Sequence, residues 1–234
     1  MALAVDSTST KTQNNGSFPL SWTHTPVGSP NLVVVGLAAI GEEDFVRVMS
    51  VTYGALSLTD SGSSAQGPGA GIKSAFWYGV SPSSGPQTIT ITTDYDQSIT
   101  AVGCCFAFTG ANTSSPITAV TGIGSTGSTA SITTGNSSGS MCLSLLGVDE
   151  IHDTITATVG GGETQQFNLE VGFNTPYIYH IIGAASLQNP ATDGILNWAI
   201  SGSYPYAIAA MEVKAAAVAP VPMGGAFQLM FGKP

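Results

Sequence analysis

Charge is scarce in this 234-residue sequence: only 8% of the residues are charged, against about 25% in an ordinary globular protein. Fourteen acidic and five basic residues give a formal net charge of −9. The basic residues are dispersed along the chain, at Lys11, Arg47, Lys73, Lys214 and Lys233. Nucleic acids and anionic membranes are bound through clustered Lys and Arg, so we expect neither as a partner.

Long apolar runs are missing too. No stretch approaches the roughly 20 apolar residues that span a bilayer. The first ten residues lack the basic start and apolar centre of a secretory signal. We therefore do not expect export by the general secretory route.

The three cysteines do not form a disulfide framework. Cys104 and Cys105 are adjacent, so in a strand their side chains face opposite sides. No CxxC spacing indicates a metal site. Free cysteine usually acts as a small buried hydrophobic residue, which is the role expected here. A cross-strand bridge from Cys104 or Cys105 to Cys142 is the alternative.

Helical patterns are nearly absent, because no window keeps an apolar stripe at i, i+3, i+4 and i+7 between capping residues. Short β-branched and aromatic runs, separated by Gly, Pro, Ser and Asn, occur throughout. They predict strands at residues 3–8, 18–24, 31–40, 46–53, 71–80, 87–93, 99–109, 117–121, 130–133, 140–148, 155–159, 166–171, 177–187, 194–200, 207–213 and 226–231. So many short strands predict an all-β fold, a sandwich or a barrel.

The apolar pattern indicates which strands are central. Residues 32–35 are continuously apolar and residues 99–108 almost so, as in strands that are buried on both faces. Residues 177–182 are a third long candidate. Residues 87–92 alternate strictly, which predicts one buried and one solvated face.

The two ends differ from the middle of the chain. Residues 215–222 resemble an extended linker, and an apolar tail follows them. We expect arms at residues 1–17 and 214–234 around one domain at 18–213. Residues 122–127 are either a seam within it or a hairpin loop. The C-terminal arm is expected to bind a partner through Phe227, Leu229, Met230 and Phe231.

Polar clusters were considered as catalytic or metal sites. Asp149, Glu150, His152 and Asp153 are the densest, but a charged turn after a strand explains them as well. Acidic groups that could hold Ca²⁺ lack EF-hand spacing; they are Glu42, Glu43, Asp44 and Asp60, with Asp94 and Asp96. His24, His152 and His180 form no HxH or HExxH pair. We therefore predict no catalytic residue, no metal and no cofactor.

Aromatic residues give a different candidate site. Exposed aromatic rings stack on sugars, and the candidates for glycan stacking are Trp77, Tyr78, Tyr204 and Tyr206. The alternative is that these rings fill the core of a sandwich, because aromatic side chains bury a large apolar area.

Five segments carry a resemblance to a known family. They are residues 18–35 (FPLSWTHTPVGSPNLVVV), 51–54 (VTYG), 75–78 (AFWY), 84–91 (SGPQTITI) and 103–110. The series resembles the jelly-roll-like β-sandwich modules of tailed-phage virion proteins and of some bacterial surface proteins, over residues 18–213. The resemblance implies an antiparallel β-sandwich with jelly-roll character and no catalytic residues.

The resemblance and the C-terminal arm together favour a phage virion structural protein. We expect a capsid cement or decoration protein that bridges neighbouring capsomers, with the major capsid protein or other virion proteins as partners. A homo-oligomer is expected, with a trimer favoured. The alternative is a tail or head fibre adhesin that binds host-surface glycans. A lectin-like glycan hydrolase ranks last, because no pair of carboxylates at the required separation is identifiable.

Overall fold

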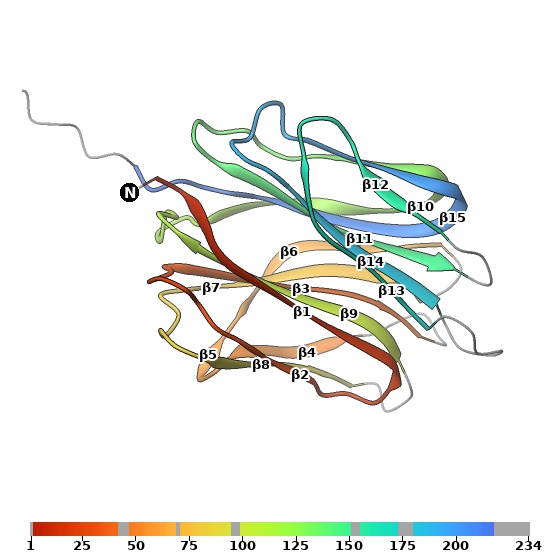
Figure 1. The fold of residues 1–234 in the computed structure, drawn as a ribbon, viewed down its shortest axis with the longest axis horizontal. Helices are drawn as coiled ribbons and strands as arrows, with labels where there is room; N and C mark the ends of the chain where they lie inside the picture. Colours follow the sequence, from red (N-terminus) through yellow and green to blue (C-terminus); the bar gives the residue numbers. More distant parts are fainter. Residues whose placement is uncertain are drawn as a thin grey trace, which may run out of the picture.

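The computed structural model describes residues 2–41, 47–68, 71–94, 99–150, 155–172 and 180–217. Within these residues all regular elements are β-strands in antiparallel sheets, as Figure 1 shows, so the predicted all-β sandwich is confirmed. The first nine strands are β1 (Ala4–Gly16), β2 (Leu20–His24), β3 (Leu32–Ile40), β4 (Val48–Tyr53), β5 (Leu56–Ser57), β6 (Thr59–Gln66), β7 (Lys73–Val80), β8 (Gln87–Thr93) and β9 (Ile99–Thr109). The last six are β10 (Ile117–Thr133), β11 (Met141–Glu150), β12 (Ala157–Val159), β13 (Thr164–Val171), β14 (His180–Gln188) and β15 (Ile195–Val213).

The strands form three sheets. The central sheet has the order β1-β9-β3-β7-β6, and the outer sheet has the order β2-β8-β4-β5. The long sheet has the order β10-β15-β11-β14-β13, with β12 paired to β15. The central sheet lies between the other two (Figure 1). The first nine strands therefore build two layers, and the last six cover the central sheet from the other side.

Pairing among the first nine strands is nested. β1 pairs with β9, β2 with β8, β3 with β7 and β4 with β5, all antiparallel. The chain up to β4 thus runs beside the chain from β5 to β9 as one long ribbon. The ribbon is rolled so that successive strand pairs alternate between the two sheets: β1–β9 and β3–β7 lie in the central sheet, and β2–β8 and β4–β5 lie in the outer sheet. β6 is added at the edge of the central sheet, paired with β7.

Three hydrophobic cores fill the spaces between the layers. Core 1 lies between the central and long sheets, and core 2 between the central and outer sheets. Core 3 lies on the far face of the long sheet. Residues 129–133 of β10, the short β12 and residues 195–200 of β15 cover it.

Strands β3 and β9 are buried on both faces, as predicted. Every residue of β3 is buried, and so is every residue of β9 except the last. In β3, Val34 and Ala38 belong to core 1, whereas Val33 and Val35 belong to core 2. A continuous apolar run suits this position because both faces of the central sheet are covered.

The three cysteines are free and buried, each in a different core. Cys104 lies in core 1, Cys105 in core 2 and Cys142 in core 3. A sheet therefore separates each thiol from the next, and the alternative of a bridge to Cys142 is wrong. Burial raises the pKa of all three thiols, so none is activated as a nucleophile.

Three segments differ from the expectations. Residues 4–16, assigned above to an N-terminal arm with a strand at residues 3–8, form one long strand, β1, which pairs with β9 at the edge of the central sheet. Residues 59–66, for which no strand is predicted above, form β6. Residues 122–127 are neither a seam nor a hairpin loop but the middle of β10. Glycine is required there because a Cβ on Gly122 would collide with the backbone of Ser64 in β6.

Candidate functional site

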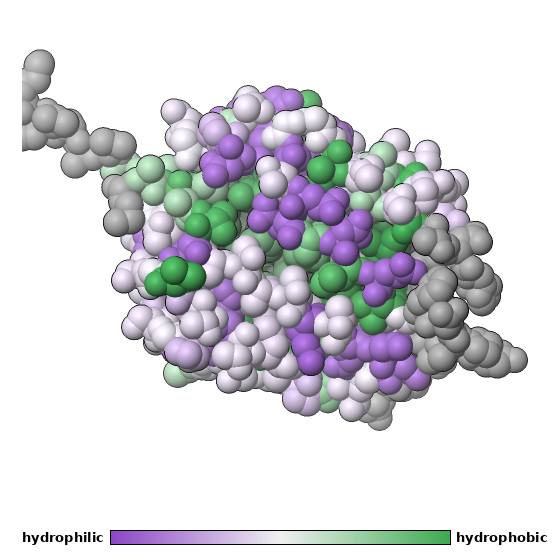
Figure 2. All heavy atoms as spheres, in the orientation of Figure 1, coloured by the Kyte–Doolittle hydropathy of each residue, from purple (hydrophilic) through white to green (hydrophobic). Residues whose placement is uncertain are grey.

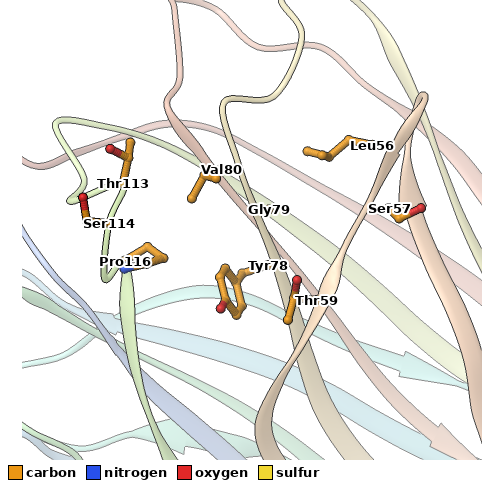
Figure 3. A pocket seen from close by; sticks show the side chains of 9 residues that line it. All are labelled: Leu56, Ser57, Thr59, Tyr78, Gly79, Val80, Thr113, Ser114 and Pro116. Atoms are coloured by element: carbon orange, nitrogen blue, oxygen red, sulfur yellow. The ribbon is translucent and has the colours of Figure 1, made fainter.

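A surface pocket of about 260 Å³ lies where β5, β6 and β7 meet the connector between β9 and β10. Figure 3 shows its lining residues: Leu56, Ser57, Thr59, Tyr78, Gly79, Val80, Thr113, Ser114 and Pro116. Apolar side chains and a tyrosine ring form part of the wall, and hydroxyl groups form the rest. Such a mixture suits either an apolar side chain or one sugar ring.

The connector wall of this pocket is held in place by side-chain hydrogen bonds. Asn31 Nδ2 donates to Ala111 O (2.7 Å), and Ala111 N donates to Asn31 Oδ1 (3.1 Å). Asn112 Oδ1 accepts from Ser114 N (2.9 Å) and Ser115 N (3.1 Å) in an Asx turn. The pocket lip is therefore preformed.

The last described residues run along the same connector. Lys214 N donates to Pro116 O (2.8 Å), and Asn112 N donates to Lys214 O (2.9 Å). Ala216 N donates to Gly110 O (2.8 Å). The chain therefore leaves the body beside the pocket. The predicted partner-binding residues Phe227, Leu229, Met230 and Phe231 lie outside the described residues.

The aromatic residues predicted to stack on glycans are not brought together. Trp77 is only 6% exposed in core 2, and Tyr206 is 7% exposed in core 3, so neither offers a ring face to solvent. Tyr204 is half-buried against core 3. Tyr78 alone of the four lines the pocket. The alternative of core aromatics is thus correct for Trp77 and Tyr206.

The acidic candidates are also dispersed. Asp149 is 3% exposed, and burial raises the pKa of its carboxyl from 3.8 to about 6. Asp60 Oδ1 accepts from Gly62 N (2.8 Å) in a turn, and Asp94 lies 3.9 Å from Arg47 in an exposed ion pair. The remaining members fall outside the described residues or side chains: Glu42, Glu43, Asp44, Asp96, Glu150, His152, Asp153 and His180. Where the structure is described, no three His, Cys, Asp or Glu residues form a metal site.

A group that sequence reasoning missed surrounds His24, where β1 meets β2. The ring is buried, with Nδ1 2.9 Å from Ser9 Oγ and Nε2 3.0 Å from Ser7 Oγ. Ser7 Oγ donates to Asp6 Oδ2 (3.0 Å), and Trp22 Nε1 donates to Ser9 Oγ (3.0 Å). The signal in the sequence is that Ser7 and Ser9, like Trp22 and His24, are two residues apart and share a strand face.

This group has the composition of a Ser-His-Asp triad but a different order. Asp6 contacts Ser7 rather than the imidazole, and its carboxylate also accepts from Val27 N (2.9 Å) and Gly28 N (2.7 Å). Ser9 Oγ, the oxygen that would act as the nucleophile, already accepts a hydrogen bond from the indole N–H of Trp22. Burial lowers the pKa of His24, and Asp6 partly offsets this. The arrangement ties β1 to β2 and to the turn that follows.

A second group that the sequence did not indicate is a chain of hydrogen bonds that starts at Trp198 in core 3. Trp198 Nε1 donates to Ser144 Oγ (3.0 Å), and the hydroxyls of Ser144 and Ser186 are 2.7 Å apart. Ser186 Oγ donates to Glu163, whose other oxygen accepts from Asn197 N (2.6 Å). An indole can only donate, so the hydroxyls point from Trp198 towards Glu163. The network satisfies buried polar groups and fastens the folded-back strands to β11 and β14.

Comparisons with known proteins give no relative: no protein-family model, no curated protein and no solved structure matches this chain. Among the described residues there is no helix that could cross a membrane. Interpretation of the site therefore depends on its own geometry.

Proposed function

We propose that this chain is a non-enzymatic structural protein of a phage virion, a capsid cement or decoration protein that bridges and stabilises neighbouring capsomers. The observation that supports this most is the nested pairing of β1–β9, β2–β8, β3–β7 and β4–β5 over two facing sheets. We assign this order to a jelly roll, an eight-stranded double sheet that recurs in viral capsid and lectin domains. The analogy with those capsid domains links this fold to a role in a virion.

The composition of the surface and the net charge support an assembly role. Figure 2 shows a mostly pale surface, which reflects the abundance of Ser, Thr and Gly and the scarcity of charge. The net charge of −9 is complementary to a basic patch on a shell. Under this proposal the partners are the major capsid protein or other virion proteins, the chain is a homo-oligomer, with a trimer favoured, and it joins the virion in the host cytoplasm.

The anchor in this proposal is the apolar end of the chain. Phe227, Leu229 and Phe231 alternate with other residues, so in an added strand they would share one face. Burial of such side chains on a partner stabilises a complex by about 1.5–3 kcal/mol each before ordering costs. Because residues 214–216 pair with the connector, a truncation that leaves the body intact must end after Ala217.

The test is co-sedimentation of the full chain with candidate phage capsids. We expect the wild type to bind, and the triple variant Phe227→Ser, Leu229→Ser, Phe231→Ser to lose at least roughly 100-fold in affinity. Val27→Ser is the matched control, because Val27 is an 86% exposed apolar residue in a turn of the body. Failure of the wild type to bind any shell would contradict the proposal. Equal binding by the triple variant would show that these three residues do not anchor the chain to the shell.

The second candidate function is a fibre adhesin that binds host-surface glycans, and the pocket favours it. The Tyr78 ring lies beside Thr59, and Ser57 and Thr113 line other parts of the pocket (Figure 3). An aromatic ring can stack on a sugar face while hydroxyl groups hydrogen-bond its edge. A glycan array tests this. A binding signal that persists in Tyr78→Phe and disappears in Tyr78→Leu would support an adhesin, and the absence of any signal would reject it.

A further inference from the structure

The pocket of Figure 3 lies beside the point where the described chain ends. Pro116, which lines the pocket, accepts a hydrogen bond from Lys214 N, and Ala216 is bonded to Gly110 at the start of the connector. Ala217 is the last described residue. Whatever follows Ala217 therefore starts next to the pocket.

The pocket is continuous with two of the hydrophobic cores. Tyr78 and Val80 are partly buried against core 1, and Leu56 is partly buried against core 2. Their exposed parts face the pocket together with Pro116. An apolar side chain placed there would extend both cores and remove this surface from water, which is favourable at about 25 cal/mol per Å².

The sequence after Ala217 has the length and composition to supply that side chain. Six residues (218–223) precede the Gly224-Gly225 pair, and six residues (226–231) follow it. Gly-Gly is a preferred two-residue turn, so a reversal there would return Phe231 to the neighbourhood of residue 218. Pro220 and Pro222 lack the N–H groups that point to the outer edge of such a hairpin, where no partner is needed.

We propose that the chain's own C-terminal segment occupies this pocket, with Phe231 inserted between Leu56, Val80 and Pro116. The occupant comes from the same chain because a short tether gives an effective concentration in the millimolar range, well above that of a second copy in dilute solution. This proposal does not depend on a virion role. If both proposals hold, the segment is stored on the body until a shell displaces it.

Disulfide trapping in the full chain tests the contact. Ser114→Cys places a thiol on the exposed pocket lip, and Gly232→Cys places one next to Phe231. The native cysteines are buried, so a mild oxidant acts on the introduced pair. The matched control pairs Gly232→Cys with Met49→Cys, a 56% exposed site on the outer sheet that the pocket does not include. We expect the pocket pair to close at least about tenfold faster than the control pair, as an intramolecular bond.

Adding Phe231→Ser to the pocket pair supplies the specific readout. The proposal requires this substitution to reduce closure by at least about tenfold, to the rate of the control pair. Equal rates for the two pairs, or closure that ignores Phe231→Ser, would overturn it. So would disulfide-linked dimers in place of the intramolecular bond, because the occupant would then be a second copy. Shell binding is measured separately, so failure here leaves the virion proposal unaffected.

Discussion

Asp149 provides a test of the structure through the pH dependence of stability. Its carboxyl is 3% exposed at the end of β11, and burial raises its pKa from 3.8 to about 6. An acid whose pKa is higher in the folded state favours folding in its protonated form. Below pH 3.8 the carboxyl is protonated in both states, so it does not destabilise the folded state. Between about pH 4 and 6 its ionisation lowers the free energy of unfolding increasingly, and above about pH 6 this loss of stability is constant. At about 1.4 kcal/mol per pH unit, the limiting penalty is about 3 kcal/mol.

Asp149→Asn removes the charge with little change in volume. We expect the variant to be more stable than the wild type by about 1–3 kcal/mol at pH 7.5 and nearly equal to it at pH 4, in urea unfolding followed by tryptophan fluorescence. Asp193→Asn is the control with the opposite sign. Hydrogen bonds from Gln188 and Ile195 lower the pKa of Asp193, so its loss should destabilise the protein, and more so at pH 7.5. A decrease in stability of Asp149→Asn at pH 7.5 would contradict the conclusion that the charged Asp149 carboxylate is buried and destabilising.

Three further predictions concern the cores. Gly183→Ala would place a Cβ 2.5 Å from Val102 Cβ across core 1, so it should lower the free energy of unfolding by about 1–3 kcal/mol. Gly161→Ala, in the open turn between β12 and β13, should be nearly neutral in the same thermal unfolding measurement. Trp198→Phe removes the donor to Ser144, and we expect it to lower the free energy of unfolding by about 1–3 kcal/mol. In a double-mutant cycle with Ser144→Ala, much of this loss should be shared between the two substitutions. Fully additive losses would contradict the network. Each cysteine should react with a thiol reagent at least roughly a thousandfold more slowly than in urea, and rapid native labelling of any one would show that its core is open.

The apolar pattern of the sequence was sufficient to identify the central strands. The runs around Val33 and Cys104 consist almost entirely of apolar residues, and a strand needs this only when sheets cover both of its faces. The opposite facing of Cys104 and Cys105 followed from the two-residue period alone. These predictions held because they depend on local geometry.

Other elements could not be inferred because distant residues determine them. β6 has the sequence of a loop, TDSGSSAQ, yet Ser63 Oγ donates to Ala210 O (2.6 Å), 147 positions further along the chain. In the same way, the polar residues 9–16 lie beyond the strand predicted at residues 3–8, and they continue β1 because β9 provides a partner for their backbone. A propensity scale contains no term for a partner supplied by another part of the chain.

The candidate site was found only in part for the same reason. The pair Trp77-Tyr78 was identified, but the pleat of β7 sends Trp77 into core 2 and leaves Tyr78 on the pocket side. Thr113 and Pro116 join Tyr78 only because Asn31 holds the connector against the end of β3. No local sequence motif indicates this tertiary hydrogen bond.

The nested pairing has a consequence for how the chain folds. β1 leaves a ribosome before the other described strands, yet its partner β9 ends at Thr109, so Ala4 must wait until Thr109 has been made before it can pair. The apolar face of the central sheet that forms core 1 waits longer still, until β11 and β15 are available. Topologies dominated by such distant contacts fold slowly and expose unpaired strands meanwhile. We therefore expect refolding in milliseconds to seconds or longer, and a nascent chain that depends on chaperones until its last strand is complete.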